Sequence, residues 1–468
     1  MLDTVVMKFG GTSVGGAAAI RQLIEIVRAG RTRWPGVAVV VSAMSGVTDI
    51  LLHTAHAAER GEAHLAPAAA EKLREKHLAA LRELAPAAPG VADHITACLD
   101  EFAALCHAIG VLGEASPRAL DAIAALGERM SAPLVAAALE RAGVPARPVD
   151  AAEVVLTDSV YQAASPDMEA TRARAASVVQ PLLAAGVVPV ITGFIGATRA
   201  GVVTTLGRGG SDFSGAIFGV ALEAREVWIW TDVTGVMTAD PRVVKAARTL
   251  PEMTFREISE LAYYGAKVLH PKTIRPVVER GIALWVKNTF QPELPGTRIV
   301  ADSGPVQGSV RAVTAFRGQC ILTLEGRGMM GIPGIAARTF AAVARTRTSI
   351  SLISQASSEQ SICFVVPRAA SETVQQALEE EFRLEFARGD IDTITASPEC
   401  AVVTVVGAGM RHTPGIAGRV FSALGAAGVN VVVIAQGSSE CSISLVVEAG
   451  QADEAVRAIH QMIETVGG

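Results

Sequence analysis

The last third of the chain contains one structural unit twice. Gly334 and Gly415 lie 81 positions apart, and a series of other residues recurs at the same separation. The paired positions are Gly328 and Gly409, Pro333 to Ala336 and Pro414 to Ala417, Phe340 and Phe421, Gln355 and Gln436, Ser357 to Glu359 and Ser438 to Glu440, and Ser361 and Ser442. Each copy has the pattern of a strand, a glycine and proline turn, a helix, two strands joined by the Ser-Ser-Glu turn and a second helix. The repeat therefore predicts two small α+β domains that stack against each other.

The N-terminal end begins with a strand, a glycine turn and a helix. Thr4 to Phe9 has the pattern of a buried strand, Gly10 to Ser13 that of a turn, and Ala17 to about Ala29 that of an amphipathic helix. Lys8 lies near the carboxyl end of the strand, where open α/β sheets bind their ligands. A lysine buried there needs an anionic partner, although a surface lysine beside a turn fits the pattern equally well.

Further strands follow, and most of them end in polar or glycine-rich segments. The expected strands are Val37 to Val41, Val187 to Thr192, Val202 to Thr205, Glu226 to Trp230 and Ile282 to Val286. Between the first two of these, Thr54 to Leu139 is rich in Ala, Leu and Glu and is predicted to be a helical insertion. A connection rich in Pro and Gly, Gln291 to Gly308, marks a domain boundary. The residues before it are predicted to form an α/β domain.

The turn Leu206 to Asp212 (LGRGGSD) is the strongest single candidate for a ligand site. Its glycines let backbone N–H groups approach a ligand, and the apolar run that follows, Phe213 to Leu222, can form a helix whose N-terminus attracts phosphate. Arg208 and Asp212 can hold the opposite charges of a zwitterion. Taken alone, the stretch also suits a tight strand-to-helix connection with a solvated charge pair.

Three other segments carry groups that suit a nucleotide or substrate. Thr231 and Asp232 follow a strand and lead to Arg242, which offers hydroxyl, carboxylate and guanidinium groups for ribose and phosphate. Lys267 is a candidate second cation, although it equally fits an exposed helical lysine. Glu128, in the helical insertion, is by base rate a solvated carboxylate.

Composition excludes several classes of protein. The net charge of −5 gives no electrostatic footprint for nucleic acid or an anionic membrane. The six cysteines show no CxxC spacing, which disfavours a thiolate metal site. The N-terminus has no basic leader and no stretch is expected to approach the length of a membrane span, so a cytoplasmic location is predicted. Gly326 to Gly331 matches G-x-G-x-x-G but lacks the acidic residue of a dinucleotide site, and no P-loop motif is present.

Taken together, the motifs resemble those of a known family. KFGGTS from Lys8, the LGRGGSD turn, WTDVTGV with ADPR between Trp230 and Arg242, and GAKVLHP from Gly265 look like the aspartate kinases of the amino-acid kinase superfamily. The paired repeats look like ACT regulatory domains. The resemblance runs from Val5 to about Ile463. It implies a three-layer α/β/α sandwich over residues 1–300, followed by ferredoxin-like ACT domains at 309–392 and 400–468, contiguous or interlaced through a shared strand at Val310 to Ala315.

The resemblance also implies an activity and a set of site residues. The family transfers the γ-phosphoryl group of ATP to the β-carboxylate of L-aspartate, the first step towards lysine, threonine and methionine, with Mg²⁺ held mainly by the nucleotide phosphates. The implied catalytic residues are Lys8, Arg208 and Asp212. The implied ATP-binding residues are Lys8, Phe9, Gly10, Gly11, Thr231, Asp232, Met237, Arg242 and Lys267. The implied aspartate-binding residues are Ser42, Thr48, Glu128, Phe194, Arg208 and Asp212. Met237 stands where the family commonly has a tyrosine, which puts the detail of base recognition in doubt.

The ACT resemblance implies feedback control and assembly. Gln355, Gln436 and Asn430 are the expected contacts of an amino-acid effector, with threonine favoured and lysine as the rival, in a homodimer or larger homo-oligomer. The repeats most resemble the threonine-sensitive kinase half of aspartate kinase/homoserine dehydrogenase fusions. The chain ends at Gly468, where the dehydrogenase would begin, so a monofunctional or truncated protein is expected. Two alternatives stay open: another amino-acid kinase, such as one acting on glutamate, and a non-catalytic amino-acid sensor.

Overall fold

The computed structural model describes residues 2–207, 209–265, 269, 271–301, 310–355, 360–410, 413–436 and 441–466. The chain divides into two compact units. The N-terminal unit comprises Met1–Val236, Thr249–Phe255 and Val268–Asp302, and the C-terminal unit comprises Met237–Arg248, Arg256–Lys267 and Ser303–Gly468. Two segments that precede residue 300 therefore pack with the C-terminal unit, whereas the sequence had assigned them to the first domain.

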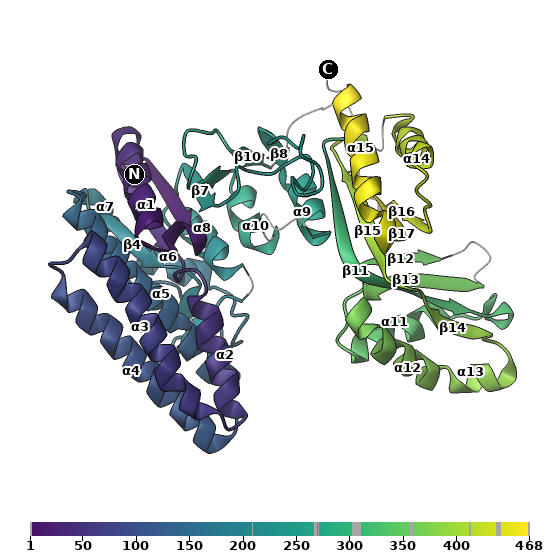
Figure 1. The fold of residues 1–468 in the computed structure, drawn as a ribbon, viewed down its shortest axis with the longest axis horizontal. Helices are drawn as coiled ribbons and strands as arrows, with labels where there is room; N and C mark the ends of the chain where they lie inside the picture. The colour runs from purple at the N-terminus through teal and green to yellow at the C-terminus, as the bar shows by residue number, and fades with distance from the viewer. Residues whose placement is uncertain are drawn as a thin grey trace. The chain divides into compact units, whose positions relative to one another are not determined.

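A single large sheet organises the N-terminal unit (Figure 1). In the described part of the chain it has eight strands, in the order β3 (Ala146–Val149), β4 (Val188–Thr192), β2 (Gly36–Val41), β1 (Thr4–Phe9), β7 (Glu226–Thr231), β9 (Ala283–Asn288), β10 (Thr297–Val300) and β8 (Glu252–Thr254). All neighbouring pairs are parallel except β9 and β10. Every residue of β1 and β2 is buried, because helices cover both faces of a parallel sheet.

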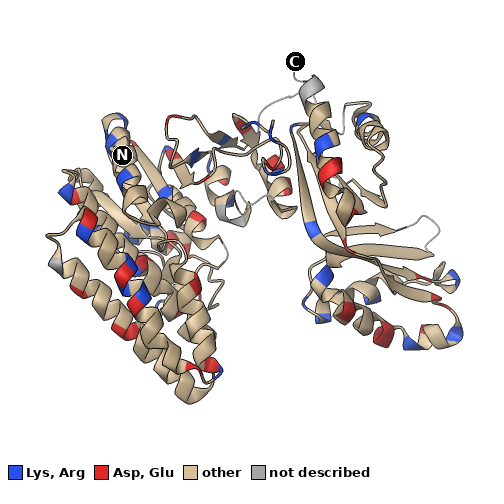
Figure 2. Cartoon of the chain, in the orientation of Figure 1, with Lys and Arg blue, Asp and Glu red and all other residues tan. Residues whose placement is uncertain are grey.

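Helices flank this sheet. Their bounds are α1 (Ala17–Arg33), α2 (Val47–Glu59), α3 (Ala66–Leu84), α4 (Pro89–Leu112), α5 (Pro117–Arg141), α6 (Met168–Val178), α7 (Gln180–Ala184), α8 (Gly210–Ala221) and α10 (Pro271–Glu279). The predicted helical insertion thus consists of α2 to α5. A small hairpin of β5 (Ile195–Ala197) and β6 (Val203–Thr205) leads from the sheet towards α8. Figure 2 shows that the positions of acidic and basic residues are interspersed along the helices.

The expectation that no stretch approaches the length of a membrane span is wrong. Among the described residues, α4 and α5 are long and apolar enough to cross a membrane by length and composition alone. Most of α5 is buried in the protein core, which is the other situation that produces such a helix.

The C-terminal unit contains the sequence repeats. Its strands are β11 (Ala312–Glu325), β12 (Leu352–Gln355), β13 (Ser361–Pro367), β14 (Thr393–Ala396), β15 (Cys400–Val406), β16 (Val433–Ala435) and β17 (Ser442–Glu448). Its helices are α9 (Phe255–Tyr263), nearly all of which packs here, α11 (Ile335–Arg345), α12 (Ser371–Glu381), α13 (Arg383–Arg388), α14 (Ile416–Ala426) and α15 (Ala452–Val466).

The long strand β11 takes part in both repeats. Its first part, from Ala312 to Phe316, pairs antiparallel with β15, and after a register shift Gln319–Glu325 pairs with β13. The same second part also pairs with β14. The strand order is therefore β12-β13-β11-β14 in the first repeat and β16-β17-β15-β11 in the second. The fourth strand of the first repeat is β14. The fourth strand of the second repeat is the first part of β11, which comes before the rest of the first repeat in the chain.

Candidate functional site

A cavity of about 710 Å³ opens at the carboxyl ends of β1, β2 and β7. Its lining comes from the turn after β1, the segment from Ser42 to Leu52, one face of α5, the exit of β7, and Gln162, Phe194, Thr205, Gly207 and Gly209–Ser211. Predicted site residues among those that line it are Gly10, Gly11, Ser42, Thr48, Glu128, Phe194, Thr231 and Asp232. Side chains far apart in sequence meet here because parallel strands place their carboxyl ends at one edge of the sheet.

Lys8 is buried and ion-paired. Only 6% of the residue is exposed, and its Nζ lies 2.5 Å from Oδ1 of Asp212 in the first turn of α8. This resolves the two readings of Lys8, because a surface lysine would have neither the burial nor the partner. Gly215 allows the close approach of α8, since a Cβ there would lie 3.1 Å from Cβ of Lys8.

Glu128 is a buried carboxyl group whose hydrogen bonding within the described structure is incomplete. It is 3% exposed, and its Oε2 has no hydrogen-bond partner among the described residues. Burial raises its pKa to about 8, against the opposing effects of a backbone hydrogen bond from Ala43 and the charge of Lys8. By base rate a helix carboxylate of this kind is solvated, and the burial of Glu128 excludes that interpretation.

Backbone conformations in the glycine-rich turn are those that glycine permits. Gly207 and Gly209 have φ angles of 75° and 73°, and Gly209 caps the start of α8. Phe194 lines the cavity with a left-handed φ of 66°, and its N–H donates to Oγ of Ser214 at 2.8 Å. The start of α8 borders the cavity through Gly210 and Ser211, so its positive dipole end is available to an anion. Arg208 lies outside the described residues.

Relatives of the chain decide its family. The amino acid kinase family matches residues 3–288, and the ACT domain matches residues 322–382 and 403–463. Aspartokinase 1, chloroplastic, of Arabidopsis thaliana is 33% identical over 98% of this chain and 80% of its own length. The chain belongs to the aspartokinases. Within the amino acid kinase family it therefore combines an α/β kinase fold with two ACT domains.

Other relatives and solved structures agree with this membership. Bifunctional aspartokinase/homoserine dehydrogenase 1, chloroplastic, of Zea mays is 35% identical over 97% of this chain, and the chain spans 50% of that protein, about half the length of the bifunctional relatives. The crystal structure of E. coli aspartokinase III in complex with lysine and aspartate matches with a TM-score of 0.80 and 31% identity, over 98% of this chain and 99% of that one.

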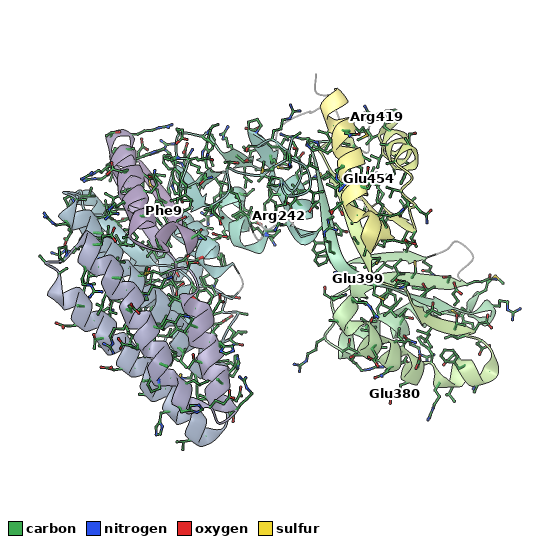
Figure 3. All side chains as sticks on the ribbon, in the orientation of Figure 1. Phe9, Arg242, Glu380, Glu399, Arg419 and Glu454 are labelled. Carbon is green, nitrogen blue, oxygen red and sulfur yellow. The ribbon has the colours of Figure 1, made fainter. Side chains whose placement is uncertain are left out.

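Of the residues expected to bind ATP in this aspartokinase, some line the cavity and others do not. Gly10, Gly11, Thr231 and Asp232 line the cavity, and Thr231 donates to Oδ1 of Asp232 at 3.1 Å. The side chain of Phe9 does not face it: Phe9 is fully buried and stacks on Trp230, with ring centroids 6.0 Å apart (Figure 3). The side chain of Phe9 packs in the sheet core, so the prediction that Phe9 binds ATP stays a prediction about its backbone.

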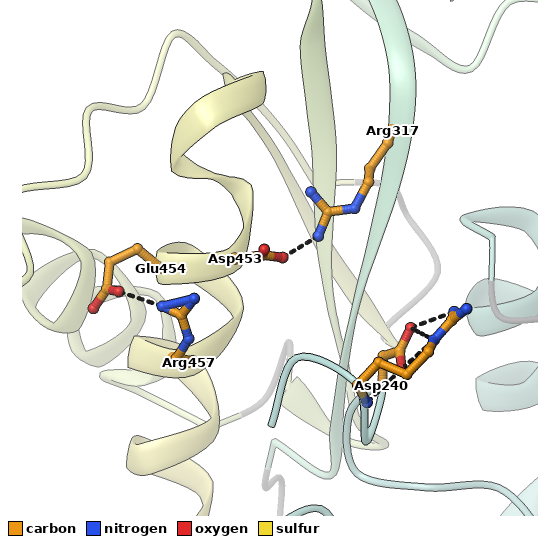
Figure 4. Close-up of polar contacts among 6 residues, drawn as sticks. Asp240, Arg317, Asp453, Glu454 and Arg457 are labelled. Carbon is orange, nitrogen blue, oxygen red and sulfur yellow. Dashed lines mark hydrogen bonds and ion pairs between the residues drawn. The ribbon is translucent and has the colours of Figure 1, made fainter. Parts of the chain in front are cut away.

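Met237 and Arg242 belong to the C-terminal unit, where the structure pairs Arg242 with Asp240. Nη2 of Arg242 lies 2.7 Å from Oδ2 of Asp240, and hydrogen bonds from Arg242 lower the pKa of that carboxyl (Figure 4). The Arg242 side chain is 87% exposed. Met237 is half-buried. Lys267 lies outside the described residues.

The cavity fits phosphate groups better than it fits a dedicated metal cage. A Cβ at Gly11 would lie 3.2 Å from the carbonyl oxygen of Ala43, so only glycine leaves this part of the turn open. Over the described ranges, no group of three or more His, Cys, Asp or Glu side chains is placed to hold a metal ion. Mg²⁺ commonly binds through substrate phosphates with one or two carboxylates.

The predicted effector residues lie at equivalent, exposed positions of the repeats. Gln355 ends β12, and Gln436 directly follows β16. Asn430 is exposed, and its backbone N–H donates to Oε1 of Gln451 at 3.3 Å. The Ser-Ser-Glu turns that follow both glutamines lie outside the described residues.

The sequence analysis missed Asp121, Gln162 and Thr205, all of which line the cavity. Asp121 lies seven residues before Glu128 on α5, which puts the two carboxylates on one helix face. Because the resemblance had already implied Glu128 as a substrate-binding residue, this spacing could have indicated Asp121. Gln162 lies in a loop that no local pattern ties to the site.

Proposed function

We propose that this aspartokinase transfers the γ-phosphoryl group of ATP to the β-carboxylate of L-aspartate, giving 4-phospho-L-aspartate and ADP. The observation that carries the proposal is the buried Lys8, ion-paired with Asp212, at the end of β1 beside a cavity that is lined by the buried Glu128 and by glycine backbone. A zwitterionic substrate needs buried groups of both signs, and a phosphate needs backbone donors and a cation. The E. coli aspartokinase III complexes with aspartate and with ADP support both ligand classes.

The chemistry asks for positioning rather than for a covalent intermediate. A β-carboxylate oxygen attacks the γ-phosphorus, a new P–O bond forms, and the bond to the ADP oxygen breaks. Mg²⁺ bound to the phosphates supplies charge neutralisation. Lys8 is the residue of this chain best placed to stabilise negative charge on the transferring group, because it is buried and its charge is little screened by water.

Aspartate binding must rearrange the charges of the ligand-free site. We assign the α-ammonium group to Glu128 and Asp212 and the α-carboxylate to Arg208. In the structure Asp212 pairs with Lys8, so an ammonium group that engages Asp212 releases Lys8 for the phosphoryl group. Ser42, Thr48 and Phe194 complete the pocket. Substrate binding and the activation of Lys8 are thereby coupled.

For regulation we propose inhibition by threonine through Gln355 and Gln436. The side-chain amides of these residues are exposed at equivalent ends of β12 and β16, and they suit a polar, uncharged side chain. Lysine is the rival effector, because E. coli aspartokinase III was crystallised with lysine. A homodimer or larger homo-oligomer joined through the ACT domains is part of the proposal.

The deciding experiment is ATP-dependent formation of acyl phosphate, trapped as the hydroxamate, with aspartate and with glutamate, in the presence and absence of threonine or lysine. Turnover with aspartate that falls with threonine supports both proposals. Turnover that falls only with lysine keeps the kinase and overturns the effector. Preference for glutamate identifies a different amino-acid kinase, and binding of amino acids without turnover identifies a sensor. Gln436→Ala should keep the activity and lose the inhibition.

A further inference from the structure

Asp121 joins three separate elements at the cavity wall. It lies on α5, is 1% exposed and lines the cavity. Its Oδ1 accepts a hydrogen bond from Oγ1 of Thr205 at 2.7 Å, and its Oδ2 accepts one from the Thr205 backbone N–H at 2.9 Å. The backbone N–H of Gln162 donates to both oxygens, at 3.1 and 3.0 Å. A buried carboxylate with three donors is fully compensated, so it is not a group that waits for a ligand.

The donors belong to two segments that line the cavity beside α5. Thr205 ends β6 and lies two residues before Gly207 of the glycine-rich turn. Gln162 has a left-handed φ of 66°, which is uncommon for a residue with a side chain. The two segments touch, because a Cβ at Gly207 would lie 2.7 Å from the carbonyl oxygen of Gln162. The strained conformation of Gln162 and the tight contact at Gly207 are both held by hydrogen bonds to Asp121.

We propose that Asp121 is a positioning residue for the acceptor substrate. It fixes the Gln162 loop and the glycine-rich turn against α5, two helical turns from Glu128, and so sets the width of the pocket between Glu128 and the start of α8. The inference rests on the proposed function, because the reaction to be measured is phosphorylation of aspartate. Asp121 acts through Thr205 and Gln162 and does not itself contact the reacting atoms.

A positioning role and a purely structural role predict different kinetics. Misplacing the wall weakens alignment of aspartate, so it raises KM for aspartate and lowers kcat while leaving the nucleotide side unaffected. A purely structural role lowers the melting temperature and the fraction of active enzyme, with both KM values unchanged. The ratio of kcat to KM measured separately for aspartate and for ATP distinguishes the two.

Asp121→Asn is the direct test, because it preserves shape, removes the charge and replaces one accepting oxygen with an N–H₂ donor that faces the backbone N–H of Gln162. We expect kcat/KM for aspartate to fall by about 10- to 100-fold, with KM for ATP and the circular dichroism spectrum unchanged. Asp158→Asn is the matched control. Asp158 accepts hydrogen bonds from the backbone N–H groups of Val160 and Ser165 in the same loop, but it is exposed and does not reach Thr205. It should leave kcat/KM unchanged.

Thr205→Val removes only the hydroxyl donor and should shift kcat/KM for aspartate in the same direction by a smaller factor. If Asp121→Asn does not fold, this variant decides the matter. Wild-type kinetics in folded Asp121→Asn, or in Thr205→Val, would overturn the role of Asp121, as would an equal loss in Asp158→Asn. The wild-type protein is measured first. Absence of turnover with aspartate in the wild type would overturn the proposed function, whereas normal turnover in the variants would overturn only the role of Asp121.

Discussion

Glu128 in the N-terminal unit and Glu257 in the C-terminal unit are both almost inaccessible, at 3% and 0% exposure, but they differ in what surrounds them. Glu257 on α9 lies 3.2 Å from Nη1 of Arg311 and accepts the backbone N–H of Ala408 at 2.9 Å. Glu128 keeps one carboxylate oxygen without a hydrogen bond in the described structure and faces a cavity. A buried charge with partners from its own fold holds the fold together, whereas one whose partners are incomplete fits a ligand.

The local sequence around Glu128 and around Glu257 does not distinguish the two residues. Both lie on helices, and both would be taken for solvated carboxylates. What separates them is the set of chain segments packed around each. The neighbours of Glu257 supply a guanidinium and a main-chain donor, so its charge is neutralised locally. Glu128 instead borders the cavity and Lys8, and the charge of Lys8 is already paired with that of Asp212.

Lys8→Ala tests whether the charges around Glu128 serve turnover. We expect kcat to fall by about 100- to 1,000-fold, because a preorganised cation next to the transferring phosphoryl group is lost. Hydroxamate formation at saturating aspartate and ATP measures it. Lys72→Ala, on the exposed face of α3, is the control. A Lys8→Ala protein that loses stability but keeps its turnover would show that Lys8, like Glu257, has a structural role.

Glu257→Gln should destabilise the protein by about 3 kcal/mol, because it removes a buried negative charge that faces the largely buried Arg311 guanidinium. Urea unfolding followed by circular dichroism gives the free energy. Glu252→Gln is a matched control: Glu252 also pairs with an arginine, Arg298, at 3.5 Å, but both side chains are more than 40% exposed, and such pairs contribute little. Equal losses in the two variants would contradict the structural role of Glu257.

Glu128→Gln should raise the free energy of unfolding at high pH, which is the opposite of the effect expected for Glu257→Gln. The raised pKa of about 8 means that folded Glu128 keeps its proton while the unfolded chain ionises above about pH 4.5. The unfolding free energy of the wild type therefore falls as pH rises from 4.5 to 8. Because each pKa unit corresponds to about 1.4 kcal/mol, the shift from 4.5 to about 8 corresponds to roughly 5 kcal/mol, and Glu128→Gln should be more stable than wild type by up to that amount at pH 9 and equal to it below pH 4.5. Melting curves at several pH values check this. A variant less stable than wild type at pH 9 would show that Glu128 has structural partners after all.

Aspartate binding should release a proton near pH 7. An ammonium group placed against Glu128 favours the ionised carboxylate and lowers its pKa from about 8. Calorimetric titration with aspartate in buffers of different ionisation enthalpy measures the number of protons released. We expect a value approaching one for wild type and near zero for Glu128→Gln. Equal values in the two proteins would remove Glu128 from the ammonium site.

Much of the fold could be predicted because its strongest signals are local. Thr4 to Phe9 was predicted as a strand with the bounds it has as β1, and the predicted strand Val37 to Val41 differs from β2 by one residue. The short strands β3, β8 and β10 were not predicted. Three or four residues carry too little periodicity to be read alone, and these strands exist because a neighbouring edge of the sheet is available.

The sequence by itself determined the repeat, the α/β pattern, the family and the types of residue in the site, because each depends on local spacing or on motifs that stay together in the chain. Only the tertiary structure decided which side chains are buried and what they contact. In it the Phe9 side chain packs away from the cavity, Lys8 pairs with Asp212, and Asp121 accepts hydrogen bonds from Thr205 and Gln162. It also gave the second repeat a fourth strand from β11. Burial and pairing depend on segments tens to hundreds of residues apart, and a local pattern contains no information about where such segments meet.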